Sequence, residues 1–154
     1  MATQTSNLTF ERSFSLPPAR LWMLLTDPKM REAWGAPSED AVLTMEISDL
    51  REGGFEIHHC GPKEAPEFTV ETRWYKLNAS EDACYTETLV IGGEKLFTSL
   101  VTYALVETAS GTDLGIHVAI TSFGDEDMTA DIKEGWEGGL ANLMKLAASQ
   151  ALPA

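Results

Sequence analysis

The stretch MTADIKEGWEGGLANLMKLA, residues 128–147, decides the fold of this chain. Apolar side chains at steps of three and four residues form a single stripe along a helix. The acidic run Asp125-Glu126-Asp127 in front of it suits a helix N-terminus. We therefore predict a long amphipathic C-terminal helix that must cover a sheet. Its stripe consists of Met128, Ile132, Trp136, Leu140, Leu143 and Ala147.

The region before this helix, residues 42–121, has the pattern of successive strands. Apolar residues alternate with polar ones, as in Phe68, Val70, Thr72 and Trp74. Hairpins that follow one another predict an antiparallel meander of six strands whose apolar faces line a concave interior. Turn-forming residues separate the strands at Gly53-Gly54, Gly61-Pro62, Asn78-Ala79-Ser80, Gly92-Gly93 and Ser110-Gly111.

The N-terminal region predicts one further strand and two short helices. Residues 8–14 alternate like a strand, and residues 1–7 form a polar tail that we expect to be frayed. Proline at a first helical turn opens helices at Pro17-Pro18, running to about Thr26, and at Asp27-Pro28, running toward Trp34. Gly35-Ala36-Pro37 ends the second helix. The fold class is therefore α+β in the order β-αα-β6-α, as a single domain over 1–154, ordered from about 7 to 150.

Composition narrows the classes of partner. The 154 residues carry a net charge of −13, which opposes contact with nucleic acid and anionic membranes. From residue 78 onward 12 acidic side chains face only 3 basic ones, so a ligand of negative charge must avoid that half. No export signal or membrane span is visible, which predicts a cytoplasmic protein. We expect Cys60 and Cys84 to be reduced and to pack as small apolar side chains.

Several short motifs, in their order and spacing, resemble those of a known superfamily. They are Pro17-Pro18 with Leu21-Trp22, Thr26-Asp27-Pro28, Trp34-Gly35, Asp49 through Gly53-Gly54, and Gly135-Trp136 with Leu140 and Leu143. The chain resembles START-related helix-grip (SRPBCC) domains, in the branch similar to activators of the heat-shock-protein-90 ATPase. The resemblance covers nearly the whole chain. It implies a helix-grip fold, in which a curved antiparallel sheet wraps around the C-terminal helix and encloses a cavity.

This cavity suggests a binding site for a small apolar or amphipathic molecule. Aromatic side chains on inward faces often form the walls of such pockets. Gly135 and Gly139, one turn apart, either allow close packing of the helix on the sheet or leave room for a ligand. We predict a ligand-binding set of Trp34, Phe55, Ile57, His59, Phe68, Val70, Trp74, Tyr85, Glu87, Tyr103, Trp136 and Leu140.

The sequence gives weaker signals for catalysis and metal binding than for a ligand-binding cavity. Neighbouring residues on a strand face opposite ways, so only one of His58 and His59 points inward with Phe55 and Ile57, and strand parity selects His59. An inward Glu87 then completes an acid–base pair for a cyclase or hydrolase, which is one alternative function. No metal-ligand spacing or phosphate-binding loop is present, so we expect no metal or cofactor.

A third function stays open beside ligand binding and catalysis. The resemblance to activators of a chaperone ATPase implies a protein-interaction module that contacts the chaperone. The superfamily also contains lipid and hormone carriers as well as cyclases, so the fold does not select an activity. A homodimer through exposed strands or helices is a further expectation for this class of domain.

Overall fold

The computed structural model of the protein describes residues 3–36, 40–64 and 67–151. Within these residues the chain forms one strand, two short helices, six strands and a long helix, as the sequence predicts. The strands are β1 (Gln4–Phe14), β2 (Ala41–Ser48), β3 (Phe55–Pro62), β4 (Phe68–Asn78), β5 (Asp82–Ile91), β6 (Glu94–Thr108) and β7 (Gly111–Ser122). The helices are α1 (Pro18–Thr26), α2 (Pro28–Trp34) and α3 (Thr129–Ala151).

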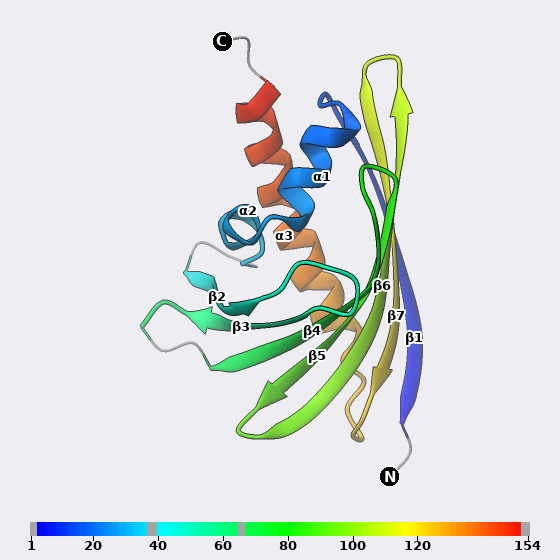
Figure 1. The fold of residues 1–154 in the computed structure, drawn as a ribbon. Helices are drawn as coiled ribbons and strands as arrows, with labels where there is room; N and C mark the ends of the chain where they lie inside the picture. Colours follow the sequence, from blue (N-terminus) through cyan, green and yellow to red (C-terminus); the bar gives the residue numbers. More distant parts are fainter. Residues whose placement is uncertain (1–2, 37–39, 65–66, 152–154) are drawn as a thin grey trace.

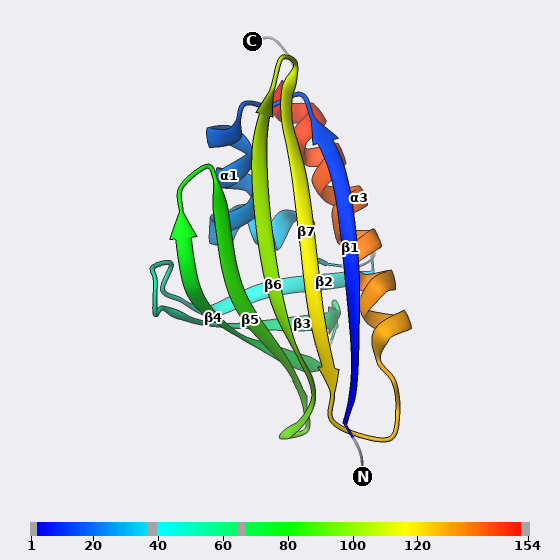
Figure 2. The same ribbon diagram turned by 90° about the vertical axis from the view of Figure 1, so that its right-hand side faces the viewer.

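The seven strands form a single antiparallel sheet in the order β1-β7-β6-β5-β4-β3-β2. Strands β2 to β7 form a meander, and the last of them, β7, pairs with β1 along the whole length of β1. The sheet is strongly curved, so that β2 and β3 run across the direction of β6 and β7 (Figure 2). Helix α3 lies in the hollow of this curve (Figure 1). The predicted helix grip is confirmed.

Two boundaries differ from the sequence prediction. Strand β1 begins at Gln4, which pairs with Ser122, so the prediction of a frayed tail through residue 7 is wrong. The polar residues 4–7 complete the ladder with β7, a long-range pairing that local polarity does not reveal. Gly61 still belongs to β3, opposite Val42, so the hairpin turn follows the Gly61-Pro62 pair.

The two short helices meet at Asp27, which serves both of them. Its backbone N–H donates to the Met23 carbonyl at the end of α1. Its carboxylate accepts a hydrogen bond of 3.1 Å from the Met30 N–H and so caps α2. Pro28 at the first helical position fixes the start of α2. The predicted end at Gly35-Ala36-Pro37 falls partly outside the described residues, since Pro37 is not described.

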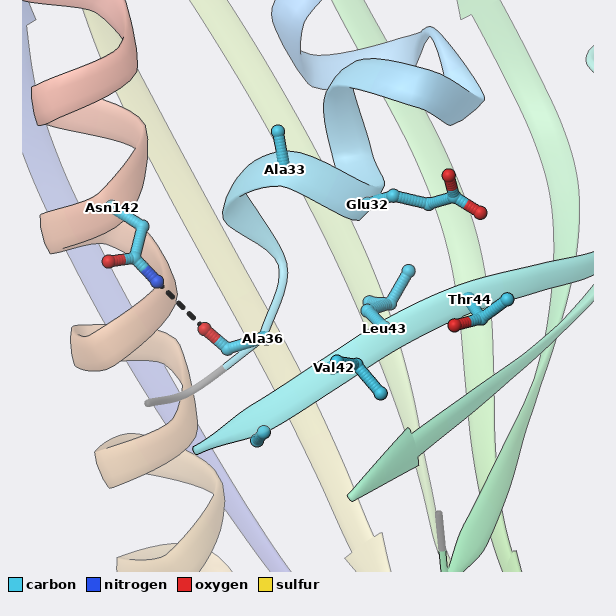
Figure 3. A pocket seen from close by; sticks show the side chains of 8 residues that line it. Glu32, Ala33, Ala36, Val42, Leu43, Thr44 and Asn142 are labelled. Carbon is cyan, nitrogen blue, oxygen red and sulfur yellow. Dashed lines mark hydrogen bonds between the residues drawn. The ribbon is translucent and has the colours of Figure 1, made fainter. Parts of the chain in front are cut away.

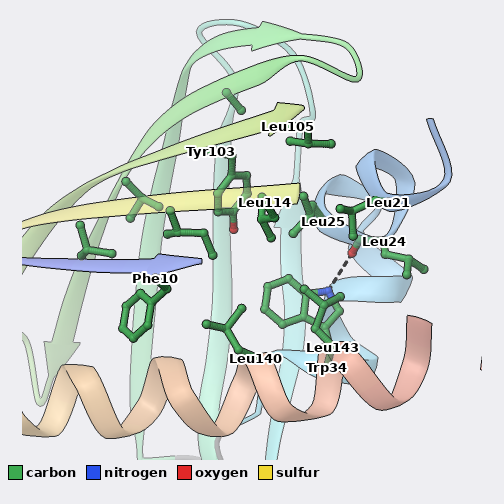
Figure 4. Packing of buried hydrophobic residues seen from close by; sticks show 14 of the residues in the cluster. Phe10, Leu21, Leu24, Leu25, Trp34, Tyr103, Leu105, Leu114, Leu140 and Leu143 are labelled. Atoms are coloured by element: carbon green, nitrogen blue, oxygen red, sulfur yellow. Dashed lines mark hydrogen bonds between the residues drawn. The ribbon is translucent and has the colours of Figure 1, made fainter. Parts of the chain in front are cut away.

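A packed apolar core closes one end of the grip (Figure 4). Leu21, Leu24 and Leu25 of α1 are almost fully buried, as is Leu143 of α3. Strands β6 and β7 add Leu105 and Leu114 to the same cluster. Such side chains fill the space between α1, the C-terminal half of α3 and the sheet. The N-terminal half of α3 lies over a cavity instead.

Candidate functional site

A cavity of about 550 Å³ lies between the concave face of the sheet, α2 and the N-terminal half of α3. This volume falls within the usual range for small-molecule sites. Its lining is mostly apolar, with a few polar groups. The apolar and aromatic members are Trp34, Leu43, Cys60, Phe68, Val70, Leu89, Ile91, Leu96, Phe97, Met128, Ile132 and Trp136. The polar members are Arg31, His58, Tyr85, Glu87, Tyr103, Asp131 and Glu134, and Gly35, Gly135 and Gly139 complete the lining.

Trp34 forms the wall between the cavity and the packed core. Its indole N–H donates a hydrogen bond of 2.7 Å to the Leu24 carbonyl of α1, which fixes the orientation of the ring (Figure 4). On α3, a Cβ added at Gly139 would lie 3.8 Å from the Trp34 ring. A Cβ added at Gly135 would meet nothing within 4 Å. Of the two glycines, Gly135 therefore borders open space and Gly139 lies beside Trp34.

A buried ion pair supports the polar side of the cavity. The Arg31 guanidinium of α2 contacts the Glu56 carboxylate of β3, and both side chains are almost fully buried. Ser48 donates a second hydrogen bond to Glu56, at 2.7 Å. The Arg31 guanidinium carbon also lies 5.5 Å from the centre of the Trp74 ring. Burial is the largest single influence and disfavours the charge of Arg31, but Glu56 together with Tyr85 and Tyr103 outweighs it and raises the pKa of the guanidinium.

Two tyrosines form a hydrogen-bonded pair beside this ion pair. The hydroxyls of Tyr85 on β5 and Tyr103 on β6 lie 2.9 Å apart, and their rings meet edge to face. Burial raises the pKa of Tyr103 to about 12 and that of Tyr85 well above its ordinary value. Both phenols therefore stay protonated at neutral pH. One hydroxyl of the pair donates to the other, which leaves the second O–H free to donate elsewhere.

His58 and Glu87 are two further titratable groups that line the cavity. Burial, together with the nearby charges of Arg31 and His59, lowers the pKa of His58 to about 3, so its ring is neutral. Its Nδ1 atom is buried and has no hydrogen-bond partner among the described residues. Burial raises the pKa of Glu87, against the opposing charge of Arg31. In the described part of the chain the Glu87 carboxyl likewise makes no hydrogen bond.

The family comparison agrees with this architecture. A model of the family described as activator of Hsp90 ATPase homolog 1-like protein matches residues 15–148. The chain belongs to this family. The match spans α1 through nearly all of α3, which includes every residue that lines the cavity.

Solved structures show the same fold at low sequence identity. A protein from Rhizobium leguminosarum is 18% identical with a TM-score of 0.84, covering 96% of this chain and 97% of its own. A protein from Rhizobium loti is 22% identical with a TM-score of 0.81, covering 94% and 99%. One from Chromobacterium violaceum is 22% identical with a TM-score of 0.79, covering 92% and 96%. A comparison with curated proteins finds no match.

The Hsp90-activator homologue fold brings seven of the twelve predicted residues to the cavity wall. These seven are Trp34, Phe68, Val70, Tyr85, Glu87, Tyr103 and Trp136. Trp74 and Leu140 are fully buried in the core and do not line the cavity, because Arg31 and Tyr85 cover Trp74 while Leu140 belongs to the packed cluster. Whether the seven residues bind a ligand stays a prediction.

Three predicted residues lie on the opposite face of the sheet, so the predicted parity of β3 is wrong. Glu56, His58 and Cys60 face inward and are buried, whereas Phe55, Ile57 and His59 face outward. The reason is the pairing of Glu56 with Arg31, which makes burial of a carboxylate tolerable. Outside, the guanidinium of Arg73 lies 5.4 Å from the centre of the Phe55 ring, and Nε2 of His59 lies 2.6 Å from a Glu46 carboxylate oxygen.

This geometry removes the predicted acid–base pair. His59 and Glu87 face opposite sides of the sheet, so they cannot act together on one substrate. The inward histidine is His58, which sequence parity rejected. Its low pKa makes it neutral, and burial raises the pKa of the neighbouring Cys60 thiol to about 11. Neither group is therefore poised as a nucleophile or strong base at neutral pH.

A second, smaller pocket of about 380 Å³ lies between α2, β2 and α3 (Figure 3). Two of its polar side chains, Asn142 and Glu32, are already engaged. Asn142 donates a hydrogen bond of 2.8 Å to the Ala36 carbonyl, and Glu32 accepts one of 2.8 Å from the Met45 N–H. Leu43 lines both pockets, so this side chain separates them. The larger cavity, with unpaired polar atoms, is the better candidate site.

Two classes of site have no support in the residues described. Over 3–36, 40–64 and 67–151, no three His, Cys, Asp or Glu side chains converge in a way that could hold a metal ion. In the same ranges none of the helices is long and apolar enough to cross a membrane.

Proposed function

We propose that this protein binds a small apolar or amphipathic molecule in the cavity between the sheet and α3. The observation that carries the proposal is an apolar space of about 550 Å³ with a few convergent polar groups on one side. Burial of a ligand's apolar surface against Trp34, Phe68 and Phe97 would supply most of the affinity. The hydroxyls of Tyr85 and Tyr103 would orient its polar group.

A ligand panel with a cavity-filling variant tests this proposal. Dialysed protein is screened by thermal shift against fatty alcohols, fatty acids, amines, sterols and polycyclic aromatics. A ligand at one hundred times its Kd stabilises the folded state by about 2.7 kcal/mol, which raises Tm by several degrees. Gly135→Leu places a side chain in the open space beside α3 and should abolish this shift. Glu137→Leu, an exposed change on the same helix, should preserve it.

The proposal fails if a folded protein responds to no class of compound. It also fails if Gly135→Leu binds the responding compound as well as the unchanged protein does, because the site then lies elsewhere. Isothermal titration of the responding compound supplies the affinity that the thermal shift does not. The heat-capacity change of binding should be negative if apolar surface is buried.

A second function rests on the family match alone. The family description names activators of the Hsp90 ATPase, which favours a chaperone-regulating interaction. Measurement of Hsp90 ATPase turnover with and without this protein tests it, with co-purification as an independent readout. Stimulation by both the unchanged protein and Gly135→Leu would favour an interaction surface outside the cavity. No stimulation and no co-purification would remove this candidate.

A further inference from the structure

A row of polar side chains runs across the concave face of the sheet, and one of them, Glu87, lines the cavity. In the registers of β3 to β6, Glu56 is opposite Thr72, Thr72 is opposite Glu87, and Glu87 is opposite Ser99. Residues opposite one another on neighbouring strands point to the same face, with Cβ atoms about 5 Å apart. Four consecutive strands of a mostly apolar concave face therefore carry a continuous row of carboxylates and hydroxyls.

Among the described residues, only the Glu56 end of this row has hydrogen-bond partners. Glu56 is held by Arg31 and Ser48. Thr72 and Ser99 are fully buried, and in the described part of the chain their hydroxyl oxygens have no hydrogen-bond partner. Glu87 lies between Thr72 and Ser99 in the strand register and lines the cavity, and its carboxyl makes no hydrogen bond to any residue that the structure describes. A buried polar group without a hydrogen bond is costly, so the Thr72 and Ser99 hydroxyls on either side of Glu87 indicate a place where a partner is missing.

The charges around the cavity determine the kind of partner. Among the described residues of the lining, Arg31 is the only lysine or arginine, and its charge is neutralised by Glu56. The remaining charged side chains of the lining are Glu87 on β5 and Asp131 and Glu134 on α3. All three are acidic, so the field inside the cavity attracts a cation and repels an anion.

The shape of the wall fits a cation with an apolar body. The rings of Trp34, Phe68, Phe97 and Trp136 line the cavity, and aromatic faces attract ammonium groups. The His58 ring, 3% exposed and with an unpaired Nδ1 atom, lies two residues from Glu56 on the same face of β3. It offers a neutral polar contact and adds no positive charge to the cavity lining.

We infer that the ligand is a cationic amphiphile, whose amine head binds at Glu87 while its apolar body fills the space under α3. This inference rests on the proposed function and specifies its ligand class. The Glu87 carboxylate would accept a charge-assisted hydrogen bond from the ammonium group. Asp131 and Glu134 would favour entry of the cation from the α3 side. A fatty acid, which has the same body but an anionic head, would be rejected.

Three probes that share a dodecyl chain separate the effect of the head group from that of the apolar body. Dodecylammonium, dodecanol and dodecanoate are titrated below their micelle concentrations at pH 7.5, with affinity measured by calorimetry. We expect dodecylammonium to bind about tenfold more tightly than dodecanol, the effect of one charge-assisted hydrogen bond. Dodecanoate should bind more weakly than dodecanol. Glu87→Gln should remove most of the preference for dodecylammonium over dodecanol.

Two further variants keep the test independent of folding. Glu134→Gln changes an exposed lining residue, so the fold is unaffected, and should reduce the ammonium preference by about twofold. Glu137→Gln removes the same charge from α3 outside the cavity lining, together with an exposed pair to Lys133, and should leave the ammonium preference unchanged. Thermal unfolding of each variant checks that the protein is folded.

The outcomes distinguish this inference from the proposed function. If none of the three probes binds and the wider panel is also silent, the proposed function fails. If dodecanol and dodecanoate bind as tightly as dodecylammonium, binding stands and the cationic ligand class is overturned. If Glu87→Gln is folded and retains the full ammonium preference, Glu87 is not the anchor and the assignment is lost.

Discussion

The two halves of α3 lie in the same hollow of the sheet, yet their surroundings differ. In the C-terminal half, Leu140 and Leu143 are completely buried against a continuous apolar cluster. In the N-terminal half, Trp136 and Gly135 border a cavity of about 550 Å³. Helix α1 seals the packed end, where its three buried leucines fill the space between α3 and the sheet. At the other end the corresponding space is the cavity.

The difference teaches that one scaffold combines two means of stabilisation. The packed end depends on apolar contacts, each worth about 1.5–3 kcal/mol for a fully buried aliphatic side chain. The hollow end lacks many such contacts and instead holds α2 to β3 through the buried pair of Arg31 and Glu56. Four experiments follow, in order of decreasing expected effect.

Breaking the buried ion pair should be the most damaging single change at the hollow end. In Arg31→Met, Glu56 is left buried without its cation, and we expect unfolding free energy to fall by about 3–5 kcal/mol. Urea denaturation measures the loss. The double variant Arg31→Met with Glu56→Met should recover much of it, because no unpaired charge remains. Equal losses in the single and double variants would contradict the role assigned to the pair.

Truncation of leucines compares the two ends directly. Leu143→Ala removes a fully buried side chain from the packed end and should cost about 3 kcal/mol. Leu89→Ala removes a partly exposed side chain that borders the cavity and should cost about 1 kcal/mol, because part of its surroundings is already empty. Both are measured by denaturant unfolding. Similar costs would mean that the cavity is closed by neighbouring side chains in solution.

The neutral His58 predicts a pH dependence located at the hollow end. Its pKa of about 3 lies below the ordinary value of 6.5, so between these values the unfolded state binds more protons. Stability is therefore full above pH 6.5 and is lost as pH falls below it. Between pH 7 and 5.5 the loss should be about 1 kcal/mol. His58→Gln should remove this slope, and His59→Gln on the outer face should retain it.

The smallest effect concerns the glycine beside the cavity. Gly135→Ala should raise unfolding free energy by about 0.8–1 kcal/mol, since alanine is the better helix former and its Cβ meets no other atom. Thermal unfolding detects the gain as a small increase in Tm. Gly139→Ala, whose Cβ would contact Trp34 at ordinary distances, should stabilise at least as much. Destabilisation by Gly135→Ala would show that α3 packs tightly where the structure has open space.

Much of the fold was predictable because local patterns determine it. The three- and four-residue spacing along residues 128–147 identifies α3, and strict alternation on β4, β6 and β7 assigns the inward faces correctly. Asp27-Pro28 marks the start of α2 within one residue. Each of these signals is contained in a short stretch of chain, so no knowledge of tertiary contacts is required.

The site was less predictable because its polar half depends on contacts between distant elements. In β3 the apolar residues Phe55 and Ile57 suggest an inward face, but a partner 25 residues away makes burial of Glu56 possible and reverses the parity. Arg31, in a short polar helix, carries no sequence signal of burial. The inward Phe68 and Val70 pair with Cys60 and His58 across the hairpin, and this register would have revealed the correct face.

The glycines of α3 have a consequence for how the helix opens. Gly135, Gly138 and Gly139 lie at the boundary between its two halves, and each lowers the helix propensity of that boundary. Local opening therefore costs least on the cavity side, while Leu143 keeps the other half docked. Amide protons of residues 131–136 should exchange with solvent faster than those of residues 140–147. A molecule could then enter or leave through partial fraying of one helix end, without unfolding the domain.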